Sequence, residues 1–327
     1  MEMEMESDSF VISDNETDKL LRKGGPRIEA GYPGSGYIAS GDERVRGEDG
    51  VVKTKNGLEC CIPTRATLEF LACLFFFFFG TLGSVNSSAV AIAFASPDSE
   101  HRALVANPVA TFVSAVVWGG CLFLVLRAVP GIALNPFVVL NQWFFSWKKD
   151  GKPFKIDHVV HSLTETFVVI GAQFAGGFAA IVLVYFVQGR DTALIGEARP
   201  SAIIGHEAWI IVYEGTAAFL FMSLVNFYSR PRRDVNAHEQ SMFIGAVNFF
   251  LVMSFNAYTG AVINPIKALV PGIVRSIFSG VPLRTSLVYY IIGQASGFAA
   301  AGALSWAINT RAHLHRYRAI TTTPKEL

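Results

Sequence analysis

Apolar residues fall into six long blocks that are separated by short polar segments. A helix needs about 20 residues to cross a hydrocarbon core of roughly 30 Å, and each block is long enough to do so. The pattern therefore predicts an all-α membrane protein with six transmembrane helices. The blocks lie near Ala66–Phe94, Ala106–Ala128, His158–Val187, Ala208–Phe227, Ser241–Tyr258 and Ser286–Ala307.

The composition agrees with a membrane location. Of the 327 residues, 51% are hydrophobic and 16% are charged, whereas soluble domains contain about 25% charged residues. The net charge of +1 gives no indication of a nucleic-acid partner. The first fifty residues are polar, so no cleavable signal peptide is expected. We expect residues 1–60 to be a disordered tail, 61–308 the membrane domain and 309–327 a second tail.

The positive charges predict the orientation of the chain. Lys and Arg are concentrated in the loops after the second and fourth blocks and in the C-terminal tail, and the other loops contain fewer. Since such residues favour the cytoplasmic side, both termini are predicted to be cytoplasmic. The basic positions include Lys148, Lys149, Lys152, Lys155, Arg230, Arg232, Arg233, Arg311, Arg316 and Arg318.

The N-terminal tail contains a segment similar to an acidic dileucine sorting signal, formed by Glu16, Leu20 and Leu21. Such a segment would bind a sorting adaptor and direct the protein to an internal, vacuolar or endosomal membrane. The alternative is an ordinary polar tail on a plasma-membrane protein.

No cofactor or metal site is predicted. The four cysteines form no CxxC pair or metal-ligand spacing. His158, His161 and Glu165 share one helical face, for which hydrogen bonding at the membrane interface is the simpler interpretation.

The two halves of the membrane domain repeat. The hexapeptide Gly131–Pro136, GIALNP, recurs as Gly260–Pro265, GAVINP. A lone glutamate precedes each copy by one helix, at Glu69 and Glu214. Because each half has three spans, an odd number, the halves must have opposite orientations in the membrane. Downstream, each half has a glutamine before a GFAA string: Gln173 before Gly177–Ala180, and Gln294 before Gly297–Ala300.

Each Asn-Pro pair begins a short apolar run, Pro136–Phe145 and Pro265–Val274. Ten helical residues span about 15 Å, half of a hydrocarbon core, which predicts two re-entrant half-helices. Asn is a preferred N-cap and Pro suits the first turn. With inverted halves, the two N-termini meet near the midplane, where their partial positive charges oppose protons and cations. Asn107-Pro108 lacks the preceding glycine and is interpreted as the start of a transmembrane helix.

These features resemble the major intrinsic protein family, the aquaporins and aquaglyceroporins, over residues 66–307. The two Asn-Pro-Ala motifs of that family correspond to Asn135-Pro136-Phe137 and Asn264-Pro265-Ile266. The resemblance implies a homotetramer with one passive pore per subunit, in which Glu69 and Glu214 support the pore loops. It also makes residues 61–308 the channel domain, and implies no enzyme activity.

The sequence departs from the family at the motif and at the selectivity filter. Phe137 and Ile266 replace two alanines, and Lys267 stands in the position of the filter arginine. The resemblance places Val252 and Ala261 at two further filter positions. For the fourth position, on the second helix, an alignment with a shorter pore loop gives Trp118, and ungapped counting gives Ala115. The phenylalanines Phe75–Phe79 are expected to face lipid, and Gly171, Gly176 and Gly177 are expected to allow close helix packing.

Several alternatives remain. The permeant is water, glycerol, urea or a similar small uncharged solute. An ion-coupled secondary transporter would also use inverted repeats and broken helices, with Lys267 as its only candidate coupling residue. An intramembrane enzyme would need a nucleophile and a base within the spans, and no such pair stands out. The altered motifs also leave open a non-conducting structural member of the family.

Overall fold

The computed structural model describes most of the chain after residue 61. The described residues are 44–46, 52–54, 62–94, 102–146, 156–191, 195–198, 200–201, 204–228 and 236–322. Within the N-terminal segment for which the sequence predicts disorder, strands β1 (Arg44–Arg46) and β2 (Val52–Thr54) pair in antiparallel fashion.

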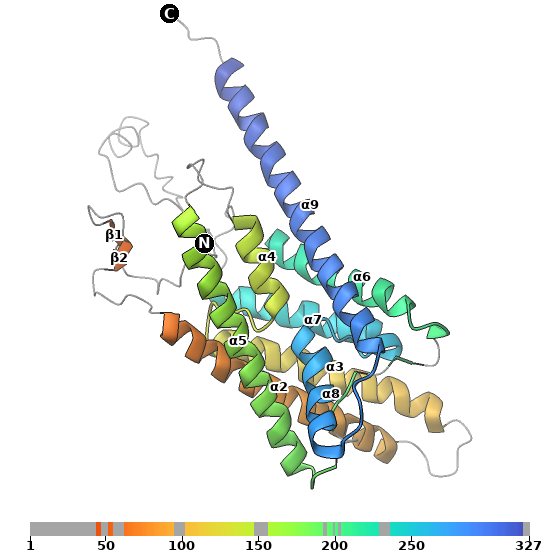
Figure 1. Ribbon diagram of the computed structural model, residues 1–327. Coiled ribbons are helices and arrows are strands. Elements are labelled where there is room, and N and C mark those ends of the chain that lie inside the picture. The colour runs from red at the N-terminus through yellow and green to blue at the C-terminus, as the bar shows by residue number, and fades with distance from the viewer. Residues whose placement is uncertain are drawn as a thin grey trace, which may run out of the picture. The chain divides into compact units, whose positions relative to one another are not determined.

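Eight helices follow within the described residues (Figure 1). Six of them are long and apolar enough to cross a membrane, which confirms the predicted number of spans. The other two, α4 (Pro136–Ser146) and α8 (Pro265–Ser279), begin at the two Asn-Pro pairs and confirm the predicted half-helices. The six spanning helices are α2 (Ile62–Phe94), α3 (Arg102–Ala128), α5 (Ile156–Val187), α6 (Trp209–Tyr228), α7 (Ala237–Thr259) and α9 (Ser286–Thr322).

The expected helix start at Asn107-Pro108 is wrong. Helix α3 begins at Arg102 and continues through Pro108, which lies inside it. Proline removes one backbone hydrogen bond there, and membrane helices tolerate this loss where neighbouring groups satisfy the freed carbonyl.

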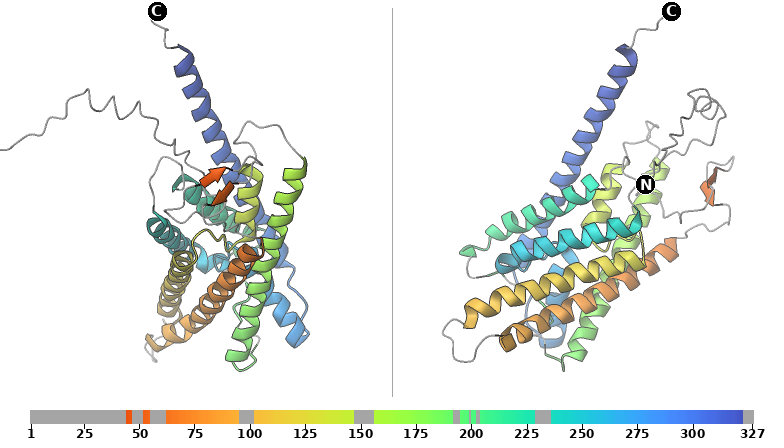
Figure 2. Two further views of the ribbon diagram at one scale, coloured as in Figure 1. Left: turned by 90° about the vertical axis from the view of Figure 1, so that its left-hand side faces the viewer. Right: turned by 180° about the vertical axis from the view of Figure 1, so that it is seen from behind.

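The two halves pack in the same way. Helix α2 packs against α5 in the first half, as α6 packs against α9 in the second, and α3 lies beside α7 between the halves (Figure 2). The α3–α7 contact is close because a glycine lies on each side. A Cβ atom on Gly119 would lie 2.9 Å from the Gly245 carbonyl oxygen, and one on Gly245 would lie 2.8 Å from that of Gly119. Small residues therefore bring the two halves into backbone contact.

The register of the repeat differs from the one that the GFAA strings suggest. A Cβ atom on Gly176 would lie 2.2 Å from the carbonyl oxygen of Phe70, the residue after Glu69. The corresponding atom on Gly297 would lie 2.1 Å from the carbonyl oxygen of Gly215, the residue after Glu214. Gly176 and Gly297 are thus equivalent, each three residues after its glutamine, and the second GFAA string is shifted by one position.

The packing roles expected for the α5 glycines hold for two of them. Gly176 approaches α2 as described, and a Cβ atom on Gly177 would lie 2.3 Å from Cγ2 of Ile266. The expectation is wrong for Gly171, because nothing lies within 4 Å of its hypothetical Cβ atom.

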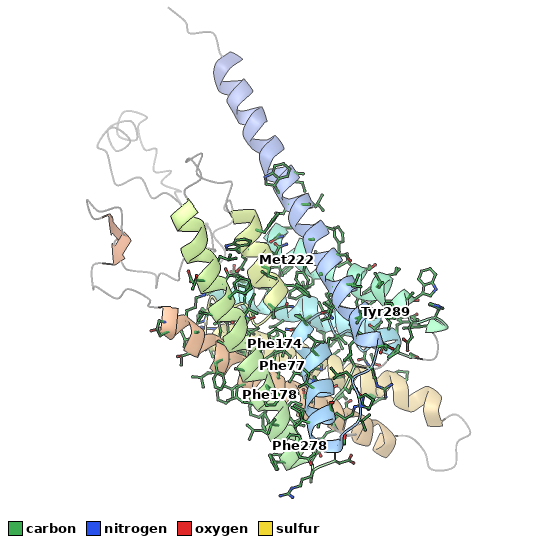
Figure 3. All side chains as sticks on the ribbon, in the orientation of Figure 1. Phe77, Phe174, Phe178, Met222, Phe278 and Tyr289 are labelled. Atoms are coloured by element: carbon green, nitrogen blue, oxygen red, sulfur yellow. The ribbon has the colours of Figure 1, made fainter. Side chains whose placement is uncertain are left out.

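The phenylalanines of α2 divide between lipid and core. Phe75 and Phe79 are exposed, as expected of lipid-facing residues, whereas Phe76 and Phe77 are buried. The expectation that the whole run faces lipid is therefore wrong, because a five-residue run extends over more than one turn of the helix. Figure 3 shows Phe77, Phe174 and Phe178 together in the packed region around α2, α5 and α8.

Candidate functional site

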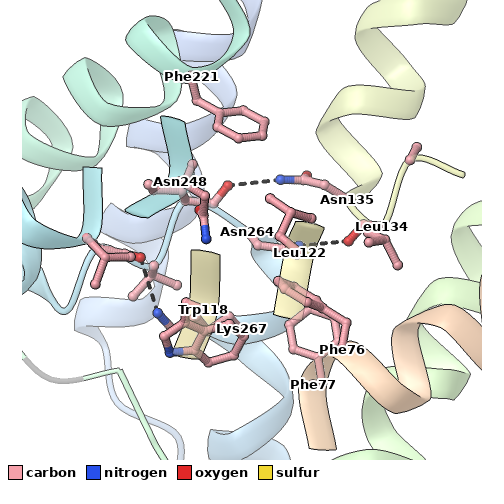
Figure 4. Close-up of a pocket in the computed structure, with 15 residues that line it drawn as sticks. Phe76, Phe77, Trp118, Leu122, Leu134, Asn135, Phe221, Asn248, Asn264 and Lys267 are labelled. Carbon is pink, nitrogen blue, oxygen red and sulfur yellow. Dashed lines mark hydrogen bonds between the residues drawn. The ribbon is translucent and has the colours of Figure 1, made fainter. Parts of the chain in front are cut away.

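The two Asn-Pro motifs meet at the centre of the membrane domain. The side-chain amide of Asn135 donates a hydrogen bond to the carbonyl oxygen of Ile263, at 3.0 Å, and the amide of Asn264 donates to that of Leu134, at 2.8 Å. Both bonds appear as dashed lines in Figure 4. Because the two bonds are reciprocal, the starts of α4 and α8 are held side by side.

Each asparagine also caps its own half-helix. The side-chain oxygen of Asn135 accepts a hydrogen bond from the Phe137 N–H at 2.9 Å, and that of Asn264 accepts one from the Ile266 N–H at 3.0 Å. These bonds satisfy backbone donors that a helix start otherwise leaves unpaired. Each motif asparagine therefore has two structural tasks in addition to any contact with a solute.

A buried carboxylate supports each motif loop. Glu69 accepts hydrogen bonds from the backbone N–H groups of Ala133, at 2.8 Å, and Leu134, at 3.2 Å. The Gln173 side chain donates a third bond to it, at 2.9 Å. Both residues are fully buried. The backbone groups just before Asn135 are thereby satisfied without water, as a non-helical segment inside a membrane requires.

Glu214 supports the second loop in the equivalent way. It accepts hydrogen bonds from the N–H groups of Val262, at 3.0 Å, and Ile263, at 2.8 Å, and from the Gln294 side chain at 2.9 Å. The Thr259 hydroxyl adds another bond.

The loop backbone needs this support. Leu134 and Ile263, the residues just before the two asparagines, have positive φ angles of 56° and 52°. Bulky L-residues rarely adopt this conformation and each costs energy there. Gly131 and Gly260 also have positive φ angles, of 85° and 82°, at no such cost. The carboxylates thus hold a strained backbone at both motifs.

The second half-helix is longer than the sequence predicts. Its apolar run was expected to end at Val274, but α8 continues to Ser279 and is capped by Gly280. The charged residue that follows Val274 is Arg275, which is buried and forms an ion pair with Glu197 at 2.9 Å. Arg284 lies on the same carboxylate at 3.2 Å. A buried counter-charge therefore allows the helix to continue past an arginine.

The two bulky motif residues, Phe137 and Ile266, pack between helices. Ile266 is fully buried and contacts α5 where Gly177 leaves room for it. Phe137 packs against Phe298 of α9, with ring centroids 5.8 Å apart. Neither Phe137 nor Ile266 belongs to the lining of the central cavity. Their size is therefore accommodated between helices and does not narrow the cavity directly.

The motif loops border a cavity of about 40 Å³ (Figure 4). This volume holds a few water molecules, since each water requires roughly 10–15 Å³ measured in this way. Asn135, Asn264 and all four residues assigned to the filter, Trp118, Val252, Ala261 and Lys267, line it. Of the two alternatives that the sequence left open for the fourth filter position, Trp118 lines the cavity, whereas Ala115 is buried and does not line it.

Lys267 is folded back toward its own loop. Its ammonium donates hydrogen bonds to the carbonyl oxygens of Gly260, at 3.1 Å, and Ala261, at 3.2 Å. It also lies 4.4 Å from the centroid of the Trp118 ring, in a cation–π arrangement. Lys267 is the charged side chain of the cavity lining. Two of the three N–H donors of the ammonium are therefore used in hydrogen bonds within the protein.

Trp118 fits the site because of a glycine that sequence reasoning missed. A Cβ atom on Gly80 would lie 2.4 Å from Cζ3 of the indole. Phe76 packs against the same ring edge-on, with centroids 5.2 Å apart.

Other lining residues were also missed, because nothing in an apolar helix marks the face that borders a cavity. The lining residues that the sequence did not assign to the pore include Phe76, Phe77, Leu122, Phe221 and Asn248.

The residues considered for a metal site do not form one in the described part of the chain. Glu165 forms an ion pair with Arg65 at 2.9 Å. The side chains of His158 and His161 lie outside the described residues. Among the residues that were placed, no group of three His, Cys, Asp or Glu side chains could hold a metal ion.

The model of the major intrinsic protein family matches residues 62–293. The chain belongs to the major intrinsic protein family. Among solved structures, the chain is similar to the X-ray structure of the aquaglyceroporin from Plasmodium falciparum. The TM-score is 0.57 and the identity 14%, over 75% of this chain and 96% of that chain. No curated protein matches.

These matches agree with the geometry. At 14% identity the structural match shows the fold alone, which is that of six spans and two half-helices. Members of the family are channels and not enzymes.

Proposed function

We propose that this protein is a passive transmembrane channel for water and small uncharged solutes such as glycerol, and that solutes cross it through the cavity between the two Asn-Pro motifs. The observation that carries the proposal is the pair of reciprocal hydrogen bonds between Asn135 and Asn264 and the opposite loops. Family membership and the similarity to an aquaglyceroporin support it.

The electrostatics of the site favour neutral permeants. Two helix N-termini, each with roughly half a positive charge, meet at the cavity. The Lys267 ammonium adds a full positive charge to the same wall. A cation or proton would approach these charges after losing part of its hydration, whereas a neutral hydroxyl compound would not be repelled.

The side chains proposed to line the narrowest part of the pore leave it wider than a channel that conducts only water requires. Val252 and Ala261 are apolar and small, and Lys267 is drawn back to the loop carbonyls. Trp118 is the bulky residue of this set, and the Lys267 ammonium lies 4.4 Å from the centroid of its ring. We infer that the filter excludes solutes mainly by size and by charge.

The flux of the reconstituted protein tests the proposal against an ion-coupled transporter and a non-conducting member. Vesicles that contain the protein should take up glycerol or urea down its gradient, with no dependence on a proton or sodium gradient and without saturation in the millimolar range. Saturable uptake that needs an ion gradient would support the transporter. Uptake equal to that of empty vesicles for water, glycerol and urea would support a non-conducting member.

The remaining assignments are predictions from the sequence and the family. A homotetramer is expected, and the mass of the detergent-solubilised protein checks it. Cytoplasmic termini are expected from the loop charges. The sorting segment, Glu16 with Leu20 and Leu21, lies outside the described residues. If this segment is a sorting signal, replacing both leucines with alanine should move the protein from an internal membrane to the cell surface.

A further inference from the structure

A third asparagine lines the central cavity. Asn248 lies on α7, four residues before Val252, so the two side chains share one face of the helix about one turn apart. Both line the same cavity as Asn135 and Asn264. Figure 4 shows Asn248 extending from α7 toward the space that the motif asparagines and Trp118 surround.

The other polar side chains of this lining are already engaged. The motif asparagines use their amide oxygens as helix caps and one amide N–H each for the opposite loop. Lys267 donates to Gly260 and Ala261. The Trp118 indole N–H is buried and without a hydrogen-bond partner in the described structure, but it is only a donor.

Asn248 differs from these groups. It forms no hydrogen bond with any described residue, and its half-buried amide borders the cavity. An amide offers two donors and one acceptor. Asn248 is therefore the lining side chain with both a free donor and a free acceptor.

We propose that Asn248 is a third pore amide that binds permeating polyols and small amides and selects them relative to water. Water in a single file keeps hydrogen bonds to the molecules before and behind it. A polyol or amide fills the cavity and loses several such partners, so its barrier depends more on groups in the wall. An unpaired amide at the midpoint replaces some of the lost bonds. This inference rests on the proposed channel function.

A structural role does not account for the residue. Asn256, two turns further along α7, shows what such a role looks like: its amide donates to the Thr111 hydroxyl of α3 at 3.1 Å. Asn248 has no equivalent contact in the described residues.

The test uses the full-length protein in vesicles and measures the ratio of urea to water permeability, and likewise of glycerol to water. Asn248→Leu has nearly the same shape without side-chain hydrogen bonds, and Asn248→Ala is smaller. Both should lower each ratio roughly two- to tenfold, the size expected when one hydrogen bond to the permeant is lost. Because alanine is smaller than asparagine and widens the cavity, a lower ratio in this variant cannot result from narrowing. Asn248→Ser, which keeps a donor and an acceptor, should retain most of the native ratio.

Asn256→Leu is the matched control, from the same helix and with the same chemical change, and should leave the ratios unchanged. If Asn248→Ala and Asn248→Leu keep the native ratios, or lower solute and water permeability equally, the role assigned to Asn248 is wrong while the channel stands. If the native protein conducts nothing, the proposed function fails, and this inference fails with it.

Discussion

Asn135 and Asn264 each donate a hydrogen bond to the carbonyl oxygen of the residue that precedes the other, at 3.0 Å and 2.8 Å. The two residues are 6% and 7% exposed, so these bonds are shielded from bulk solvent. The contact joins the two halves of the chain at the loops in which Leu134 and Ile263 have positive φ angles. It also fixes one N–H of each amide and leaves the second N–H for the cavity.

Replacing either asparagine with aspartate should lower water flux or admit cations. Asn135→Asp and Asn264→Asp remove the donor to the opposite loop and place a negative charge beside the helix N-termini. That charge offsets the positive field that opposes cations. Stopped-flow light scattering measures water flux, and a fluorescent potential dye measures cation entry. Native flux and selectivity in both variants, with normal membrane insertion, would be incompatible with a pore between these residues.

A second prediction concerns the large residue of the second motif. Gly177→Ala should lower the thermal stability of the detergent-solubilised protein, because the new methyl group would lie 2.3 Å from Cγ2 of Ile266. Overpacking of this kind typically costs about 1–3 kcal/mol. In the background of Ile266→Ala, Gly177→Ala should cost much less stability than it does in the native protein, since the smaller side chain leaves room for the methyl group.

Gly171→Ala is the control for this prediction, because it lies on the same helix with nothing within 4 Å of the added atom. It should leave the melting temperature nearly unchanged. Additive effects of Gly177→Ala and Ile266→Ala would show that the two positions do not interact.

Lys267 provides a third prediction. Lys267→Arg should lower the ratio of glycerol to water permeability, because a planar guanidinium is larger and presents a rigid set of donors to the cavity. Lys267→Ala should raise proton or cation leak, because it removes the charge and frees the carbonyl oxygens of Gly260 and Ala261 for a cation.

Lys267→Met separates charge from size, since it keeps most of the length without the ammonium. It should leak like the alanine variant. If none of the three substitutions changes any flux, Lys267 does not face the permeation path.

The parts of this structure that depend on local chemistry could be predicted from the sequence. Asn before Pro specifies a helix start wherever it follows a turn, so the starts of α4 and α8 were predicted at Pro136 and Pro265. Repetition identified Glu69 and Glu214 as a pair, and both hold the loops as expected. Long apolar blocks predicted the six spans.

The parts that depend on which helix face turns inward could not be predicted. In a membrane, lipid-facing and core-facing residues are both apolar, so periodicity does not separate Phe76 and Phe77 from Phe75 and Phe79. Asn248 is one of several polar residues in a largely apolar helix, and only its place in the folded structure shows that it borders the cavity.

Long-range partners explain the other differences. The extension of α8 past Val274 depends on the ion pair of Arg275 with Glu197, which lies in a distant loop. The register of the repeat depends on the backbone that each glycine approaches, and the similar GFAA strings concealed this relationship.

The central claim is that solute crosses the protein through the cavity beside Asn264, and blocking that cavity tests it most directly. Val252 is 1% exposed and lines the cavity, whereas Ala257, on the same helix, is exposed on its outer surface. Stopped-flow osmotic shrinkage of vesicles should show water permeability near that of empty vesicles for Val252→Trp, and near that of the native protein for Ala257→Trp. Equal, native permeability in both variants would contradict a pathway through this cavity.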